Sequence, residues 1–191
     1  MTQHKERADA RRNRETILAA ADRLFASARD SSAVSMDEVA EAAGVGKGTL
    51  FRRFGDRAGL LRSLIEEKQR PLQQAVLAGA LPLGPTGTAH DRVRTLVGAL
   101  ADFKLENRYL MLALEGGNNP YTGTQYAFWH EHVSNALAAA GVPAERVPFR
   151  AHAVLAALRS DLVEYLLSCG YSADAVKAEL TLFVGTILPP E

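Results

Sequence analysis

Residues 35–54 read SMDEVAEAAGVGKGTLFRRF, and this stretch decides the fold. The Ser35 hydroxyl can accept a hydrogen bond from the Glu38 amide, and the Glu38 side chain can reach back, which makes a capping box at a helix start. Gly44 supplies the positive φ that ends this helix. A second short helix then covers residues 47–54. The stretch therefore predicts two short helices joined by a tight turn.

Helical patterns continue on both sides of this stretch. Before it, residues 9–28 place apolar side chains at every third or fourth position, as one face of a helix requires. After it, Gly55 ends the second short helix and Asp56 caps the next one. No run of residues alternates with the period of a strand. The sequence therefore predicts an all-α fold.

The rest of the chain predicts further helices separated by stretches rich in Gly and Pro. We expect a stop or kink at Pro71, a loop over residues 78–88, and breaks at 116–120 and 141–143. The expected helices span residues 91–107, 109–115, 124–140, 148–169 and 173–188. Ser172 is expected to cap the last of them.

The composition limits the class of protein. The chain has 191 residues, of which 47% are hydrophobic, enough for a sizeable core. No apolar run approaches the roughly 20 residues that a membrane-spanning helix needs, and the charged N-terminus does not lead into a signal peptide. Cys169 is the only cysteine and lies in an apolar run, so we interpret it as a packing residue. We expect a cytoplasmic protein that does not associate with membranes.

Charge is unevenly distributed although the net charge is zero. Residues 1–70 contain 14 basic and 11 acidic side chains, whereas residues 71–191 contain 8 basic and 11 acidic ones. Within residues 45–62 five basic residues accompany a single acid, Asp56. A small basic domain attached to a mildly acidic one is typical of a protein that touches phosphate with one end.

The second short helix has the properties of a DNA recognition helix. In a helix-turn-helix this element enters the major groove. Lys47 in its first turn can contact phosphate, Thr49 can contact a base edge or a thymine methyl, and Arg52 on the same face can donate to guanine. Arg53 and Arg12 are further candidates for phosphate contacts. The alternative is that these residues are solvated charges on a surface helix.

Residues 10–65 resemble the N-terminal domain of the TetR family of transcriptional regulators. The resemblance is carried by ILAAADRLF at residues 17–25, by the stretch at 35–54, and by GDRAGLL at 55–61. It implies an all-α homodimer with an N-terminal three-helix helix-turn-helix domain that binds DNA. It also implies a C-terminal helical domain that binds a small molecule and mediates dimerisation. We predict a DNA-binding domain over 1–56, with an arm over 1–9, and a ligand-binding and dimerisation domain over 57–191.

By this resemblance Lys47, Thr49, Phe51 and Arg52 occupy positions that commonly contact DNA, and Gly46 beside them is a further predicted DNA-binding residue. The chain departs from the family pattern at two of the implied DNA-binding positions. The family usually has Tyr where this chain has Phe51, so a hydroxyl contact to phosphate is lost. Gly46 stands where a Ser often caps the recognition helix, and Gly is an acceptable cap at a cost of about a few tenths of a kcal/mol.

The helices over 148–169 and 173–188 carry apolar residues on more than one face, and residues 180–188 have no charge. Such helices are buried on several sides, so we expect a second subunit to cover them in a four-helix interface. A two-fold dimer would read a roughly palindromic operator. The alternative is a monomer whose other helices wrap these two. The expected interface residues are Ala153, Ala156, Ala157, Val163, Leu167, Phe183 and Val184.

A candidate small-molecule site combines aromatic and soft apolar residues with a few polar groups. Its expected residues are Phe103, Met111, Leu114, Tyr126, Trp129 and His130. The alternative is that these residues are ordinary core, which is the more frequent role of an aromatic at helical spacing. His130 and His132 lie two apart and point to different helix faces, so no metal site is predicted, and no cofactor is expected.

The function expected from these features is that of a ligand-responsive transcriptional regulator. It would be a repressor that binds double-stranded DNA as a homodimer and is released by a small, largely apolar molecule. An enzyme is not expected, because G-x-S-x-G, H-E-x-x-H and Cys/His zinc spacings are all missing. A third possibility is a helical module whose basic helix binds an acidic protein. Salt dependence and competition by specific duplex DNA would separate that module from a DNA reader.

Overall fold

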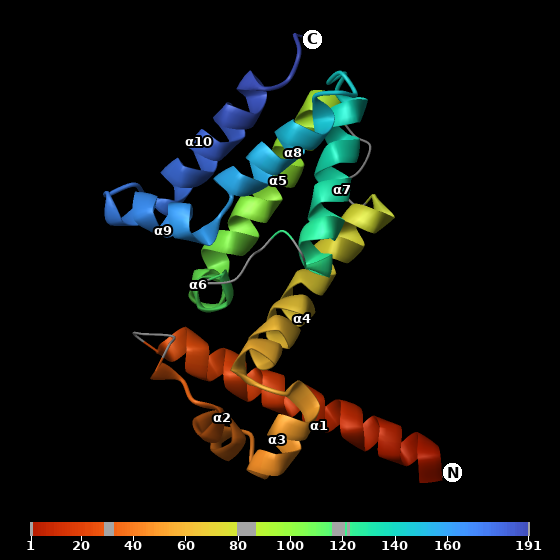
Figure 1. Ribbon diagram of the computed structural model, residues 1–191, viewed down its shortest axis with the longest axis vertical. Coiled ribbons are helices and arrows are strands. Elements are labelled where there is room, and N and C mark those ends of the chain that lie inside the picture. The colour runs from red at the N-terminus through yellow and green to blue at the C-terminus, as the bar shows by residue number, and fades with distance from the viewer. Residues whose placement is uncertain (1, 29–32, 80–86, 116–120, 122, 191) are drawn as a thin grey trace. The chain divides into compact units, whose positions relative to one another are not determined.

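The computed structural model describes residues 2–28, 33–79, 87–115, 121 and 123–190, with the backbone alone for 2–8 and 115. Over these residues the chain forms ten helices and no strand (Figure 1). The all-α prediction is confirmed. Within the same residues, no helix has both the length and the apolar character needed to cross a membrane. The chain divides into two compact units, Met1–Lys68 and Gln69–Glu191.

The first unit is a helix-turn-helix. Its helices are α1 (Thr2–Ser27), α2 (Met36–Ala42), α3 (Lys47–Phe54) and the first part of α4 (Arg57–Ala78). Helix α2 packs against both α1 and α3 (Figure 1). The largest buried side chains of this unit are Ile17, Phe25, Val39, Leu50, Leu60 and Leu61. They are the apolar residues that the helical patterns place on inner faces.

The local signals of the helix-turn-helix are confirmed. The Glu38 amide donates to the Ser35 hydroxyl over 3.2 Å, and the Ser35 amide donates to the Glu38 carboxylate over 2.8 Å. Gly44 has φ 65° and ends α2, and Gly55 has φ 77° and ends α3. Residues other than glycine rarely adopt these φ values, so both turns depend on glycine. The Gly59 amide donates to the Asp56 carboxylate over 2.7 Å, so Asp56 caps the start of α4.

Helix α4 continues through Pro71 to Ala78, so the alternative that Pro71 stops the helix is wrong. A proline inside a helix removes one hydrogen bond and crowds the preceding turn. Pro71 is exposed, and Leu72 and Val76 beyond it pack onto the core of the second unit. This packing favours continuation of the helix. The units divide within α4, after Lys68, while the domain boundary predicted at residue 56 stays a prediction.

The second unit contains the remaining helices. They are α5 (Ala89–Glu106), α6 (Arg108–Glu115), α7 (Thr124–Ala139), α8 (Val147–Ala157), α9 (Ser160–Ser168) and α10 (Ala173–Thr186). Helix α5 packs against α10 and α7, α7 packs against α8, and α6 packs against α9 (Figure 1). The core includes Val93, Val97, Val133, Leu137, Val154 and Leu158.

The single helix predicted over 148–169 is in fact two helices. Helix α8 ends at Ala157 with Leu158 as its C-cap, and Arg159 has extended backbone angles of φ −63° and ψ 138° before α9 begins. The Arg159 guanidinium pairs with Asp161 over 2.8 Å in the first turn of α9. Ser160 and Asp161 are short polar residues that favour helix starts over helix interiors. Apolar residues continue at helical spacing across the break. The sequence pattern therefore predicted one helix and not the boundary between α8 and α9.

The packing role predicted for Cys169 is wrong, because this residue is exposed. It directly follows α9 as the C-cap, and Gly170 after it has φ 95°. The chain turns away from the helix there, so the apolar run before Cys169 does not extend the core to it.

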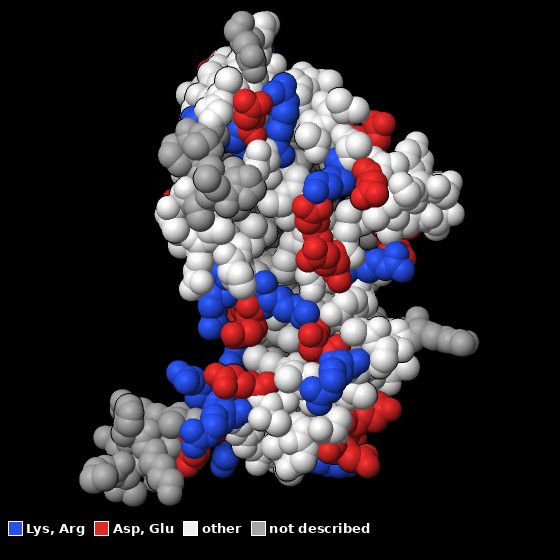
Figure 2. All heavy atoms as spheres, turned by 180° about the vertical axis from the view of Figure 1, so that it is seen from behind, with Lys and Arg blue, Asp and Glu red and all other residues white. Residues whose placement is uncertain are grey.

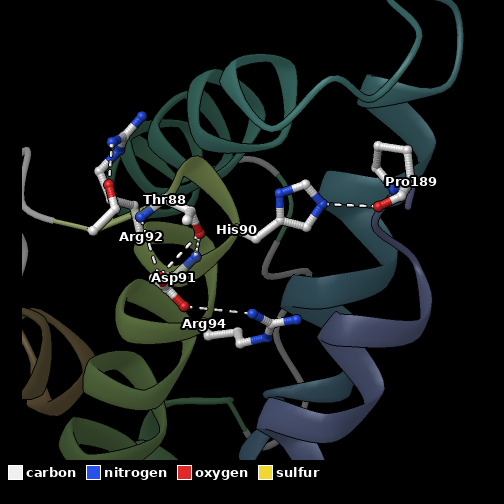
Figure 3. Close-up of polar contacts among 7 residues, drawn as sticks. Thr88, His90, Asp91, Arg92, Arg94 and Pro189 are labelled. Carbon is white, nitrogen blue, oxygen red and sulfur yellow. Dashed lines mark hydrogen bonds and ion pairs between the residues drawn. The ribbon is translucent and has the colours of Figure 1, made fainter. Parts of the chain in front are cut away.

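Helix α5 begins two residues earlier than predicted, because Thr88 and Asp91 form a second capping box (Figure 3). The Asp91 amide donates to the Thr88 hydroxyl, and the Thr88 amide donates to the Asp91 carboxylate, each over 3.1 Å. Next to this cap, the Nε2 atom of His90 lies 2.8 Å from the carbonyl oxygen of Pro189 (Figure 3). This contact fastens the C-terminal residues to the start of α5.

Candidate nucleic-acid interface

Helix α3 is held by its inner face and presents an outer face to solvent. Leu50 and Phe54 are buried. Gly46 is the N-cap, and its carbonyl oxygen accepts hydrogen bonds from the amides of Thr49 (2.9 Å) and Leu50 (3.2 Å). The position of the helix is therefore set by packing and by backbone bonds.

The outer face of α3 carries four exposed residues, Lys47, Gly48, Phe51 and Arg52. Phe51 is 45% exposed, which is unusual for a large aromatic side chain. Thr49 is half-buried at the edge of this face. The structure thus brings together the predicted contacts at 47, 51 and 52, and helix α3 contains no acidic residue.

Lys47 is already paired within the protein. Its ammonium lies 2.6 Å from the carboxylate of Asp37, which is in the first turn of α2. Both side chains are exposed, and exposed ion pairs contribute about 0–1 kcal/mol. A phosphate could therefore replace Asp37 as the partner of Lys47 at little cost. Asp37 was not among the predicted site residues, because a spacing of ten residues gives no helical signal for this pair.

Arg53 differs from its neighbour Arg52 because it points inward. Arg53 is half-buried and its guanidinium donates to the carbonyl oxygen of Ala10 in α1. Beside it, the Arg14 guanidinium lies 5.3 Å from the centre of the Phe54 ring. These contacts join α3 to α1. The helical spacing contained the signal, because Arg53 lies three residues after buried Leu50; its predicted contact with DNA stays a prediction.

Basic and acidic side chains are interspersed on α1. Arg12 is exposed and pairs with Asp9, and Arg11 pairs with Glu15 over 3.3 Å. Figure 2 shows blue and red side chains side by side at the lower left, on the N-terminal unit. Arg12 is therefore available to solvent, with a carboxylate neighbour that a phosphate could replace.

The capping box beside the interface has an electrostatic consequence. Hydrogen bonds from the backbone and side chain of Ser35 stabilise the Glu38 carboxylate and lower its pKa below the ordinary value. The carboxylate is therefore charged at neutral pH and remains bound to the start of α2.

The candidate ligand residues lie on α5, α6 and α7. Phe103, Met111 and Trp129 are buried, whereas Leu114, Tyr126 and His130 are half-buried. The Trp129 indole donates over 3.4 Å to the buried side chain of Gln69, which was not among the predicted site residues.

Tyr126 and His130 meet His152 of α8, which was not among the predicted site residues. The Tyr126 hydroxyl lies 2.5 Å from Nδ1 of His152, and the rings of His130 and His152 are 4.2 Å apart between centroids. The Nε2 atom of His130 is buried and has no hydrogen-bond partner among the described residues. Burial raises the pKa of the Tyr126 hydroxyl, and the nearby Tyr121 raises it further by a smaller amount. Among the described side chains, no three metal-ligating groups gather into a candidate metal site.

The predicted interface residues are divided between the core and the surface. Val163 and Val184 are 2% and 1% exposed and belong to the core of the second unit. Ala153, Ala156, Ala157 and Leu167 are half-buried. Phe183 is 39% exposed. Larger apolar side chains that were not among the predicted interface residues are exposed near them, namely Phe149, Leu162, Tyr165 and Leu182.

Comparisons with known proteins agree with this geometry. Residues 17–64 match the family model of bacterial regulatory proteins of the tetR family. An HTH-type transcriptional regulator of Staphylococcus aureus (strain USA300) is 30% identical over 125 residues, which are 65% of this chain and 65% of that protein. The match thus spans just under two thirds of that relative.

Solved structures share the fold at low sequence identity. A TetR transcriptional regulator from Rhodococcus sp. RHA1 has a TM-score of 0.64 at 19% identity, over 94% of this chain and 97% of that one. The TetR-like regulator LfrR from Mycobacterium smegmatis, solved in complex with proflavine, has a TM-score of 0.63 at 17% identity, over 96% and 99% of the two chains. Residues 17–64 are therefore similar in sequence to the tetR family, and the described residues share the fold of solved TetR-like regulators.

Proposed function

We propose that this protein is a DNA-binding transcriptional regulator that acts as a homodimer on a palindromic operator. The observation that carries the proposal is the outer face of α3, where Lys47, Phe51 and Arg52 are exposed beside Thr49 on a helix without acidic residues. A recognition helix needs side chains for phosphate, side chains for base edges, and an inner face that sets its angle. Leu50 and Phe54 form the inner face that sets the angle of α3.

The residues on this face have different expected roles. Arg52 has the planar fork that donates to guanine in the major groove, and Thr49 is short enough to contact a base or a thymine methyl. Lys47 is a compact positive charge suited to phosphate, and Arg12 is a second candidate for phosphate. Phe51 supplies apolar contact without the hydroxyl that a tyrosine would offer. The DNA-binding domain is proposed to span residues 1–56.

Dimerisation is supported by apolar side chains that the single chain leaves exposed. Leu162 and Tyr165 on α9 and Leu182 and Phe183 on α10 are all exposed. Apolar residues at this density on adjacent helices are typical of a protein–protein interface. A two-fold pair would present two recognition helices to half-sites about one helical turn apart, about 34–36 Å. The dimerisation and ligand-binding domain is proposed to span residues 57–191.

We further propose that a small, largely apolar effector binds among α5, α6 and α7 and lowers operator affinity, which makes the protein a repressor. Phe103, Met111 and Trp129 would supply apolar contact. The unpartnered Nε2 atom of His130, beside Tyr126, would supply a hydrogen bond to a polar group of the effector. Such an effector shifts the population between two arrangements only if it binds them unequally.

The test is selection of sheared genomic DNA from the source organism with the purified full-length protein, followed by sequencing of the enriched fragments. We expect one palindromic motif, bound far more tightly than random duplex and with an affinity that falls as salt rises. Enrichment of no motif, with equal competition by random duplex, would contradict the regulator function. It would favour the acidic protein partner instead, which pull-down at low salt would then identify.

A further inference from the structure

Gly48 lies on the outer face of α3, and nothing within the chain explains why it is a glycine. Its φ is not in the positive region that requires glycine. A Cβ atom placed on it would meet no other atom within 4 Å. Glycine inside a helix is less stable than alanine because it loses more conformational freedom on folding. The free protein would therefore be more stable with alanine at this position.

Other glycines of the helix-turn-helix unit have internal explanations. Gly44 and Gly55 have positive φ, and a Cβ on Gly59 would lie 2.0 Å from the carbonyl oxygen of Phe54. Gly46 is the N-cap of α3, a position where glycine is well tolerated. Gly48 shares neither property, so its missing side chain points to something outside the chain.

We propose that Gly48 marks the place where the DNA duplex comes closest to the backbone of α3. The inference rests on the proposed function, because it assumes that α3 enters the major groove. Helical spacing places Gly48 on the same face as Phe51 and Arg52, which lie three and four residues later. Gly48 therefore leaves a gap in the row of side chains on this face, next to Phe51 and Arg52, and we call this gap the notch.

The dimensions of helix and groove explain why such a notch is useful. A helix with its side chains is about 10–12 Å across, and the major groove is about 12 Å wide. Omitting one side chain on the inserted face lets the helix lie deeper, so that Thr49 and Arg52 reach base edges. A duplex fits this notch by charge, because α3 and its flanking turn residues 45–55 carry basic but no acidic side chains.

The test compares Gly48→Ala and Gly48→Leu with the wild-type full-length protein on the operator recovered by genomic selection. Alanine and leucine are strong helix formers, so both variants should fold. We expect Gly48→Ala to raise the melting temperature of the free protein by about 1–3 °C. We expect its operator affinity to fall by about tenfold or more, with a larger loss for Gly48→Leu.

Gly98→Ala is the matched control. Gly98 lies inside α5, and a Cβ there would make only an ordinary contact of 3.7 Å with the Lys177 side chain. This variant should keep wild-type operator affinity. The inference is supported if Gly48→Ala raises the melting temperature of the free protein and also lowers its operator affinity. Both results together would show that the missing side chain serves DNA binding and not the fold.

Three outcomes contradict the inference in different ways. Unchanged operator affinity of Gly48→Ala and Gly48→Leu, with a wild type that binds its operator, overturns the inference and leaves the regulator function intact. A lower melting temperature of Gly48→Ala than of wild type also overturns it, because the fold itself would then require the glycine. A wild type that enriches no motif overturns the proposed function, and the inference with it.

Discussion

Helices α3 and α10 are built alike on their inner sides and differ on their outer sides. Leu50 and Phe54 bury one face of α3, and Leu180 and Val184 bury one face of α10. The outer face of α3 carries Lys47, Gly48 and Arg52 beside a single aromatic, Phe51, whereas α10 exposes Leu182 and Phe183. The comparison teaches that a helix needs only one face for the fold. The chemistry of the other face is then free to match a partner, here proposed as DNA for α3 and a second subunit for α10.

Breaking the outer face of α10 should have the largest effect. In Leu182→Glu, a carboxylate replaces a side chain that is 65% exposed in the single chain and proposed to be buried in the dimer. Burying a charge without a partner is costly, so the dimer should dissociate. Sedimentation analysis should give a monomer. Operator affinity should fall by about 100-fold or more, because two linked half-sites bind more tightly than one.

Leu77→Glu is the matched control for this prediction, since Leu77 is 68% exposed and lies on α4, outside the proposed interface. It should remain dimeric and bind DNA normally. If Leu182→Glu is still a dimer, the proposed interface on α10 is wrong. If the wild type is a monomer, the proposal that the protein acts as a homodimer is wrong.

Changes on the outer face of α3 should come next. Arg52→Ala is expected to cost about 1–3 kcal/mol of operator affinity and to relax the preference at one base position, because the lost contact reads a base. Lys47→Ala should weaken all duplexes similarly and reduce the salt dependence by about one phosphate contact. Binding measured on operator variants at several salt concentrations separates the two. Two variants with wild-type affinity and specificity would exclude α3 as the recognition helix.

The neighbouring arginines of α3 sharpen the comparison of inner and outer faces. Arg53→Ala removes the hydrogen bond to the Ala10 carbonyl and should destabilise the protein by about 1–3 kcal/mol, as charged hydrogen bonds do. Arg52→Ala should leave the free energy of unfolding within about 0.5 kcal/mol of wild type. Urea unfolding followed by circular dichroism measures both. Equal destabilisation by the two substitutions would contradict the division of roles.

A smaller gain in stability is expected from Gly46→Ser. A serine hydroxyl at the N-cap of α3 could accept a hydrogen bond from an amide of the first turn, and a Cβ at this position meets only the Thr49 hydroxyl, at 4.0 Å. The expected stabilisation is about a few tenths of a kcal/mol, measured by thermal unfolding. A lower stability than wild type would show that the turn before α3 cannot accept a side chain.

The smallest effect concerns acid and compares the capping boxes of the two units. Hydrogen bonds from Ser35 lower the pKa of Glu38, and those from Thr88 lower the pKa of Asp91. Because the folded-state pKa is the lower one, each carboxylate contributes stability above its unfolded pKa and loses it as the pH falls through the folded pKa. The loss should begin near pH 4.5 for Glu38 and near pH 3.8 for Asp91.

Melting temperatures of wild type, Glu38→Gln and Asp91→Asn between about pH 6 and pH 3 would check this expectation. Each amide variant should lose less stability on acidification than wild type, because the neutral side chain does not titrate. A variant with the same acid dependence as wild type would mean that its capping carboxylate does not contribute.

Much of the helix-turn-helix could be predicted from sequence because its signals are local. The capping box of Ser35 and Glu38, the glycine at 44 and the N-cap at 46 each act within a few residues. Helix α3 accordingly begins and ends where the sequence predicts. The second unit was less predictable. Its helices are apolar on several sides, so the pattern alone did not reveal the break at Arg159 or which residues remain exposed.

The sequence by itself determined the all-α fold, the bounds of α3 and the set of basic residues near it, because capping, turn and helical spacing are local properties. Only the tertiary structure decided that Arg53 binds the Ala10 carbonyl while Arg52 faces solvent, and that Lys47 pairs with Asp37. It also decided that Val163 and Val184 are core while Leu182 is exposed. These distinctions depend on contacts between helices distant in the chain, and helical spacing does not tell which side of a helix its neighbours cover.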